Sequence, residues 1–113
     1  MDWKLGQFET YRSDGQAKVD GFVSGVFGIH DTGSRRGCWI VSHLPTGLRL
    51  SQGRGFLNIE TAKAFAGRLA PLTDWTNVDQ NAPDMTLAVE VSEIWNDLVV
   101  LDVAKNIVDH YGR

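Results

Sequence analysis

The sequence predicts an α+β domain: an antiparallel sheet from the N-terminal half, packed by a central amphipathic helix and by one or more C-terminal helices. The N-terminal half consists of strand-like segments separated by glycine-rich turns. Apolar residues then recur at steps of three and four over about 59–70 and again over about 85–111, as they do on one face of a helix. A chain of 113 residues is expected to form a single domain, 1–113.

Two strand regions are expected before residue 31. Residues 3–12 mix aromatic and polar side chains, which is typical of a strand, and residues 13–15, Ser-Asp-Gly, form a turn signal because glycine tolerates positive φ. The next region, 17–30, contains Gly21, Gly25 and Gly28. Glycines inside a strand mark bends, bulges or the close approach of another segment, so we expect one of these features here.

A glycine-flanked loop over residues 31–37 contains two adjacent arginines, Arg35 and Arg36. One interpretation is a basic loop that grips phosphate or an acidic partner. The other is a solvated hairpin tip, which is favoured because most surface charges have no role beyond solvation.

A central hairpin is expected around a three-residue loop, Pro45 to Gly47. Strand residues alternate between faces, so one face is largely aliphatic and is expected to lie against the core. Its members are Ile40, Ser42, Leu44, Leu48 and Leu50. The other face combines aromatic, imidazole and guanidinium groups: Trp39, Val41, His43, Arg49 and Ser51. We expect this second face to be exposed, where it could stack on bases or anchor a protein partner. The alternative, which is favoured because large aromatic residues are mostly buried, is that C-terminal helices cover it and Trp39 belongs to a second core.

The central helix over about 59–70 follows Asn58, whose side chain can accept a hydrogen bond from an early backbone N–H and so cap the helix. Pro71 ends the helix, because proline disfavours helical geometry in the residue before it. Alanines on its inner face would let it lie close to a sheet.

The segment that begins at Asp84 allows two interpretations. Residues 85–92 alternate apolar and polar side chains as a strand does, but they also continue a helical stripe, and the pattern beyond them favours a helix. That stripe comprises Ile94, Leu98, Leu101, Ala104, Val108 and Tyr111. A helix this apolar is expected to be buried against the sheet, against another helix or against a second copy.

Composition and charge narrow the function classes. The chain has no apolar run long enough to span a membrane, its first residues lack the features of a signal peptide, and Cys38 is the single cysteine, so we expect a cytoplasmic protein. The net charge of -3 is uneven: residues 1–30 carry -1, residues 31–73 carry +4 and residues 74–113 carry -6. This asymmetry suggests one basic and one acidic surface.

Recognisable catalytic patterns are not found in the sequence. The histidines, His30, His43 and His110, have no metal-ligand spacing, and the glycine runs do not match phosphate-binding loops. Cys38 lies in a strand beside Trp39, which favours an inert core thiol. We therefore expect a non-enzymatic protein with no catalytic residues, no metal site and no cofactor.

Residues 26–75 run strand, strand, strand, helix, with Phe56 just before the helix and alanines on its inner face. This arrangement resembles the small modules of AP2-like and phage-integrase arm-binding domains. The resemblance implies a sheet that reads the DNA major groove, with Arg35, Arg36, Trp39, His43 and Arg49 at the DNA-facing positions.

The first functional hypothesis is therefore a small binding protein, an inhibitor or adaptor of phage or mobile-element type, which contacts a protein partner through the 35–51 hairpin face. The expected contact residues are Arg35, Arg36, Trp39, His43, Arg49 and Arg54. The alternative is nucleic-acid binding through the same face. A third hypothesis is an enzyme that uses Cys38 or His43. A homodimer through the C-terminal helix is compatible with each of them.

Overall fold

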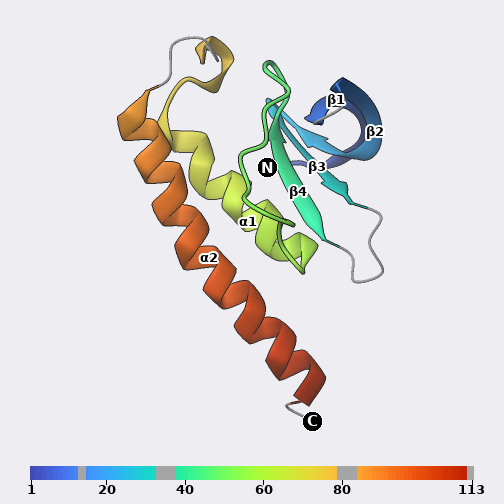
Figure 1. The fold of residues 1–113 in the computed structure, drawn as a ribbon, viewed down its shortest axis with the longest axis vertical. Coiled ribbons are helices and arrows are strands. Elements are labelled where there is room, and N and C mark those ends of the chain that lie inside the picture. Colours follow the sequence, from blue (N-terminus) through green and yellow to red (C-terminus); the bar gives the residue numbers. More distant parts are fainter. Residues whose placement is uncertain (13–14, 33–37, 79–83, 112–113) are drawn as a thin grey trace.

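The computed structural model describes the backbone of residues 1–12, 15–32, 38–78 and 84–111, and the side chains of these except 11, 12, 16 and 108–111. Its order is β1 (Lys4–Arg12), β2 (Gly15–Ser24), β3 (Phe27–Asp31), β4 (Trp39–His43), α1 (Ile59–Leu69), the 3-10 turns η1 (Ala70–Leu72) and η2 (Trp75–Asn77), and α2 (Met85–Tyr111). Helix α1 packs on β3 and β4, and α2 packs alongside α1 (Figure 1). The predicted α+β class, with an N-terminal antiparallel sheet and helices after it, is confirmed.

The sheet is an antiparallel meander with strand order β1-β2-β3-β4. The region 17–30, expected as one interrupted strand, forms most of β2 and almost all of β3. The turn between them contains Gly25, whose φ of 57° is in the left-handed region that glycine adopts without a steric penalty. The predicted Ser13-Asp14 turn lies outside the described residues.

The β1–β2 hairpin curls over the face of the sheet that lies away from the helices (Figure 1). Phe8 of β1 meets the ring of His30 edge-on at 5.8 Å between centroids. A Cβ atom at Gly28 would lie 2.8 Å from the Phe8 ring and 2.8 Å from the Leu44 side chain, so only glycine fits beneath them. The close approach at this strand glycine is made by side chains rather than by backbone, and it covers the face of the sheet that lies away from the helices.

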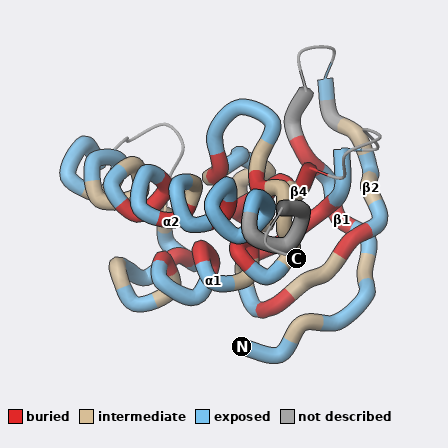
Figure 2. The backbone as a smooth tube through the Cα atoms, turned by 90° about the horizontal axis from the view of Figure 1, so that it is seen from below, coloured by how far each residue is buried: buried red, intermediate tan, exposed pale blue. Residues whose placement is uncertain are grey.

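The main core lies between the sheet and the helices. Phe56 is its centre: the ring is fully buried and lies 4.7 Å from Trp95 of α2 and 5.3 Å from Phe65 of α1, centroid to centroid. In Figure 2, the buried residues, coloured red, lie where the helices face the rest of the chain. Cys38 is a buried free thiol, as the sequence suggested.

The central hairpin differs from the prediction by one residue. Ser42 pairs with Arg49, and the His43 N–H donates to the Leu48 carbonyl at 2.8 Å, so the loop has four residues instead of three. A slip of one residue exchanges the two faces of a strand. Leu50 consequently packs with Val41 against the helices, instead of sharing a face with Ser42.

The face of β4 that we expected to be exposed is the one that packs against the helices, so this expectation was wrong. Val41 has no exposed surface, His43 is 1% exposed and Trp39 is half-buried against the core. The physical reason is that both faces of β4 are covered. The helices cover this face. On the other face Ile40 and Ser42 are also buried, and they pair with His30 and Gly28 of β3, which Phe8 covers.

The helices follow the predicted bounds closely, and residues 85–92 belong to α2. The expected stripe on α2 is buried only in part: Ile94 and Leu98 are core residues, but Leu101 is 60% exposed and Ala104 is also exposed. The reason is that Asp102 occupies the buried position in that turn. Among the described residues, neither helix combines the length and the apolar character needed to cross a membrane.

Candidate functional site

The residues expected to bind a partner are scattered by the fold. Arg35 and Arg36 lie outside the described residues. Trp39 and His43 face the core, whereas Arg49 and Arg54 are exposed on the loop that joins β4 to α1. The described residues therefore do not form the predicted contact surface on the hairpin. Of them, Arg49 and Arg54 are exposed and Trp39 is half-buried.

His43 has a structural role next to Trp75. Its Nε2 lies 2.6 Å from the Trp75 carbonyl oxygen, which can only accept, so Nε2–H donates this bond. In the neutral imidazole, Nδ1 then accepts from the Thr46 hydroxyl at 2.8 Å. The imidazole thus ties the β4 turn to η2.

Trp75 is held from three directions. Its indole N–H donates to the Leu69 carbonyl oxygen at 2.7 Å, at the end of α1. Its ring lies edge-on to Phe27 of β3 at 5.5 Å and 5.6 Å from the His43 ring. With 5% exposure and these contacts, the indole is a rigid wall rather than a mobile surface group.

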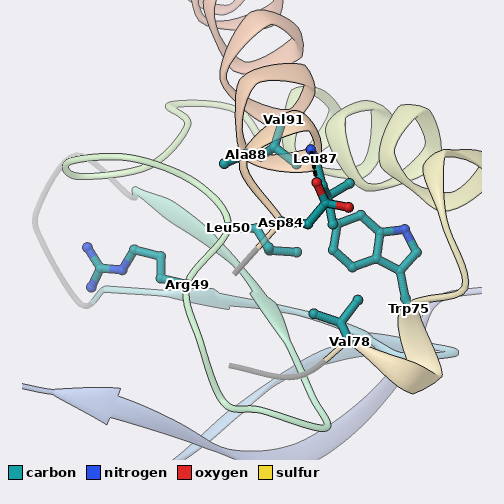
Figure 3. Close-up of a pocket in the computed structure, with 8 residues that line it drawn as sticks. All are labelled: Arg49, Leu50, Trp75, Val78, Asp84, Leu87, Ala88 and Val91. Carbon is teal, nitrogen blue, oxygen red and sulfur yellow. Dashed lines mark hydrogen bonds between the residues drawn. The ribbon is translucent and has the colours of Figure 1, made fainter. Parts of the chain in front are cut away.

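A pocket opens beside this wall, where the 48–58 loop, η2 and the first turns of α2 meet (Figure 3). Its volume is about 260 Å³. Most of its lining is apolar: Leu50, Trp75, Val78, Leu87, Ala88 and Val91, completed by Arg49 and Asp84. We call this the Trp75 pocket.

The charged groups of the Trp75 pocket are already oriented. Asp84 precedes α2 and accepts a hydrogen bond from the Leu87 N–H at 3.1 Å, which fixes its carboxylate as a helix cap. The Arg49 guanidinium points away from the apolar lining (Figure 3) and donates to the Gly53 carbonyl oxygen at 2.8 Å. The chain of Arg49 therefore forms part of the rim, while its charge faces solvent.

The 3-10 turn that carries Trp75 is stabilised by Asp74. Its carboxylate accepts from the Thr76 hydroxyl at 2.6 Å and the Thr76 N–H at 3.2 Å, and also from the Asn77 amide. The Thr76 hydroxyl and then the Asn77 amide lower the pKa of Asp74 below the ordinary value of 3.8, because these bonds favour the charged carboxylate. The turn is thus best formed when Asp74 is ionised.

The chemistry of the Trp75 pocket suits apolar recognition. Pockets for drug-sized ligands and cofactors typically start near 300 Å³, so about 260 Å³ is closer to the room taken by one large side chain. In the part of the chain that the structure describes, no three His, Cys, Asp or Glu side chains are grouped so that they could hold a metal ion.

Sequence reasoning missed most of this pocket. In the sequence, Trp75 only ends the 26–75 segment, and Leu87 and Val91 lie within residues 85–92, which show a helical or strand pattern and no sign of a pocket. Their convergence depends on how α2 lies against the 48–58 loop. A contact such as that of Gln52 Nε2 with Ser92 Oγ, at 3.1 Å, has no signature in the sequence.

No protein-family model matches the chain, and neither a curated protein nor a solved structure is similar enough to it to count as a match.

Proposed function

We propose that this domain is a small non-enzymatic binding protein, an inhibitor or adaptor, that holds one large apolar side chain of a protein partner in the Trp75 pocket. The observation that carries the proposal is a rigid apolar pocket of about 260 Å³ with Trp75 as its wall. Interface energy concentrates where an anchor side chain fills a well-packed pocket and loses its contact with water. Such a pocket needs little reorganisation to bind, which favours affinity.

The two exposed arginines suggest that the partner carries an acidic segment next to the side chain that enters the pocket. Arg49 contributes to the pocket rim and Arg54 lies further along the same loop. Residues 31–73 carry a net charge of +4. Complementary charges at the edge of an interface mainly accelerate association and select among partners, so these arginines would contribute specificity more than affinity.

Nucleic-acid binding is the competing function, and it would use the same loop. Affinity for nucleic acid depends on several phosphate contacts, and the loop offers Arg49 and Arg54 beside an apolar pocket. The apolar pocket favours the protein partner.

Two further expectations belong with this proposal. We propose a reducing, cytoplasmic environment, which is consistent with a single, buried, free cysteine at Cys38. A homodimer through the C-terminal helix is compatible with partner binding because it would use the outer face of α2 rather than the Trp75 pocket.

The test uses a displayed library of random peptides, selected against the whole domain and then measured against two variants. Ala88→Phe fills the pocket from an exposed helix position, and Ala64→Phe adds the same group to an exposed position of α1. We expect the selected peptides to share a large apolar residue. We expect Ala88→Phe to weaken them at least about tenfold, which is about 1.4 kcal/mol, while Ala64→Phe leaves their affinity unchanged.

Peptides that bind Ala88→Phe as tightly as the unmodified domain would show that the pocket is not the contact surface. The nucleic-acid function would be established instead by two results together. No peptide is selected, and the domain binds a labelled DNA or RNA duplex with an affinity that falls steeply as salt is raised. Thermal melting of both variants verifies that each is folded.

A further inference from the structure

The helix α2 has apolar side chains on two opposite faces. Its inner face, which includes Ile94 and Leu98, packs in the core. Its other face carries exposed apolar residues over the helix length: Met85 (72% exposed), Val89 (53%), Val100 (67%), Val103 (45%) and Ile107 (51%). At 3.6 residues per turn, these five lie within an arc of about 60°. We call them the outer stripe.

The outer stripe is symmetric about Asn96. This residue is exposed and lies in the same arc. Met85 and Ile107 stand equally far from it in the sequence, on opposite sides, and so do Val89 and Val103. Reversing the direction of the helix about Asn96 therefore lays these four apolar positions on one another, while Val100 meets Ser92.

We infer that α2 pairs with α2 of a second copy in an antiparallel arrangement, with the two-fold axis passing next to Asn96. A two-fold interface uses one self-complementary patch on both subunits, and the outer stripe has this property. Met85 of one copy then packs against Ile107 of the other, and Val89 packs against Val103. The two Asn96 side chains meet at the centre, where a polar pair fixes the register of paired helices.

The far end of α2 gives a second reason for a covering partner. Among the residues of α2 whose side chains are described, Asp102 is the last that is buried, and residues 103–107 are all exposed. Figure 1 shows that the C-terminal end of α2 extends past the N-terminal end of α1. Helical turns in proteins owe most of their stability to packing of an apolar face, and antiparallel pairing places Met85 and Val89 of the second copy on this end.

The size of the outer stripe sets the expected affinity. From Met85 to Ile107 it runs about 33 Å, and a helix with its side chains is about 10 Å wide. Pairing along such a strip buries an area at the lower end of specific interfaces. We therefore expect a dimer that forms at micromolar concentrations.

Charges beside the outer stripe predict how the dimer responds to salt. Glu93 is exposed on one flank, and the two-fold axis brings both copies of it to the same side, about 9 Å apart along the helices. Asp97 on that flank is partly offset by Arg68, at 3.5 Å. Salt screens the repulsion over about 8 Å, so added salt should strengthen the dimer. If a basic helix of another protein bound to this flank instead, added salt would weaken that binding.

The first experiment is sedimentation equilibrium of the whole domain, unmodified and as two variants with the same charge change. Val103→Glu puts a carboxylate into the outer stripe, and Asn106→Glu puts one on a neighbouring exposed position outside it. We expect a dimer for the unmodified domain and for Asn106→Glu, and at least about tenfold weaker association for Val103→Glu. A monomer at millimolar concentration, or equal association of the two variants, would overturn the inference.

The second experiment tests the direction of pairing in a Cys38→Ser background. The single variants Val89→Cys and Val103→Cys should not cross-link to themselves, because antiparallel pairing separates the two copies of Val89 by about 21 Å along the axis. The Val89→Cys/Val103→Cys double variant should form a disulfide-linked dimer under mild oxidation. Self cross-linking of Val89→Cys, with none gained by the double variant, would show parallel pairing and contradict the inference.

Discussion

Asp102 holds the start of α1 through Asn58: its carboxylate accepts the Asn58 backbone N–H at 3.0 Å and the Asn58 side-chain amide at 2.9 Å. It also accepts the Leu57 N–H at 2.7 Å, and it is 1% exposed. The Asn58 side chain was expected to cap α1 by accepting a helical N–H, but it makes no such bond and donates to Asp102 instead. This connection fastens α2 to the segment that leads into α1.

Removing this carboxylate should be costly. Asp102→Ala leaves the partly buried N–H donors of Leu57 and Asn58 without a partner, and we expect a loss of about 2–3 kcal/mol in the free energy of unfolding. Asp102→Asn should lose nearly as much, because its amide group presents a donor to other donors. Urea unfolding measures both. Asp97→Asn, which affects only an exposed ion pair, serves as the control and should change stability by less than about 1 kcal/mol. A stable Asp102→Ala variant would show that this connection is dispensable.

Substituting alanine for either of two glycines should change the free energy of unfolding in opposite directions. Gly28→Ala places a methyl group 2.8 Å from Phe8 and from Leu44, so we expect it to destabilise the domain by about 1–3 kcal/mol through overpacking. Gly67 lies inside α1 with nothing within 4 Å of its would-be Cβ atom. Gly67→Ala should stabilise by about 0.5–1 kcal/mol, because alanine has the higher helix propensity. Chemical denaturation of both variants is the measurement, and equal effects would contradict the close packing of β1 on β3.

The His43 connection predicts graded losses. Thr46→Val removes the hydroxyl that donates to the imidazole and should cost about 1 kcal/mol. His43→Leu also leaves the buried Trp75 carbonyl unpaired, so its cost should be greater, about 2–3 kcal/mol. The indole N–H of Trp75, followed by NMR, should shift in His43→Leu. An exposed, partner-binding His43 would predict no loss of stability in either variant, and that result would refute the buried placement.

The turn at Trp75 should depend on pH through Asp74. Since folding lowers the pKa of this carboxyl below 3.8, its contribution to stability is complete above about pH 3.8 and is lost as the pH falls through the lowered value. Thr76→Ala removes the largest cause and should raise the pKa of Asp74 towards 3.8, as followed by the carboxyl carbon in NMR. Thr73→Ala, a neighbouring exposed threonine, should leave it unchanged. An equal response to both substitutions would mean that the Thr76 hydroxyl is not responsible.

The elements of this fold were largely predictable because they depend on local patterns. The apolar spacing before Pro71 fixes α1 almost to the residue, and the pattern beyond Ile94 was enough to extend α2 back to Met85. Glycines such as Gly28 correctly marked a close approach, although they did not show which segment approaches.

The exposed face of the hairpin could not be predicted, for a physical reason. A loop longer by one residue reverses which side chains of the returning segment share a face, and Leu50 thereby joins Val41. The sequence also gives no sign that Phe8 of β1 lies over Gly28 and His30 of β3, the strand next to β4. β4 has three apolar residues followed by Ser42 and His43, and both of its faces are buried.

The Trp75 pocket depends on contacts between distant segments. Trp75 and Leu87 are separated by a connector, and their proximity follows from the packing of α2 rather than from a motif. Of the predicted contact residues that the structure describes, Arg49 reaches the pocket rim.

The most direct test of the proposed function is an NMR titration of the domain with a selected peptide, followed by amide shifts and by the indole N–H signals. The proposal predicts that the largest changes fall on Leu87, Ala88 and Val91 and on the Trp75 indole, and that Ala88→Phe abolishes them. Changes confined to β1 or to the outer stripe of α2, with the Trp75 indole unaffected, would contradict it.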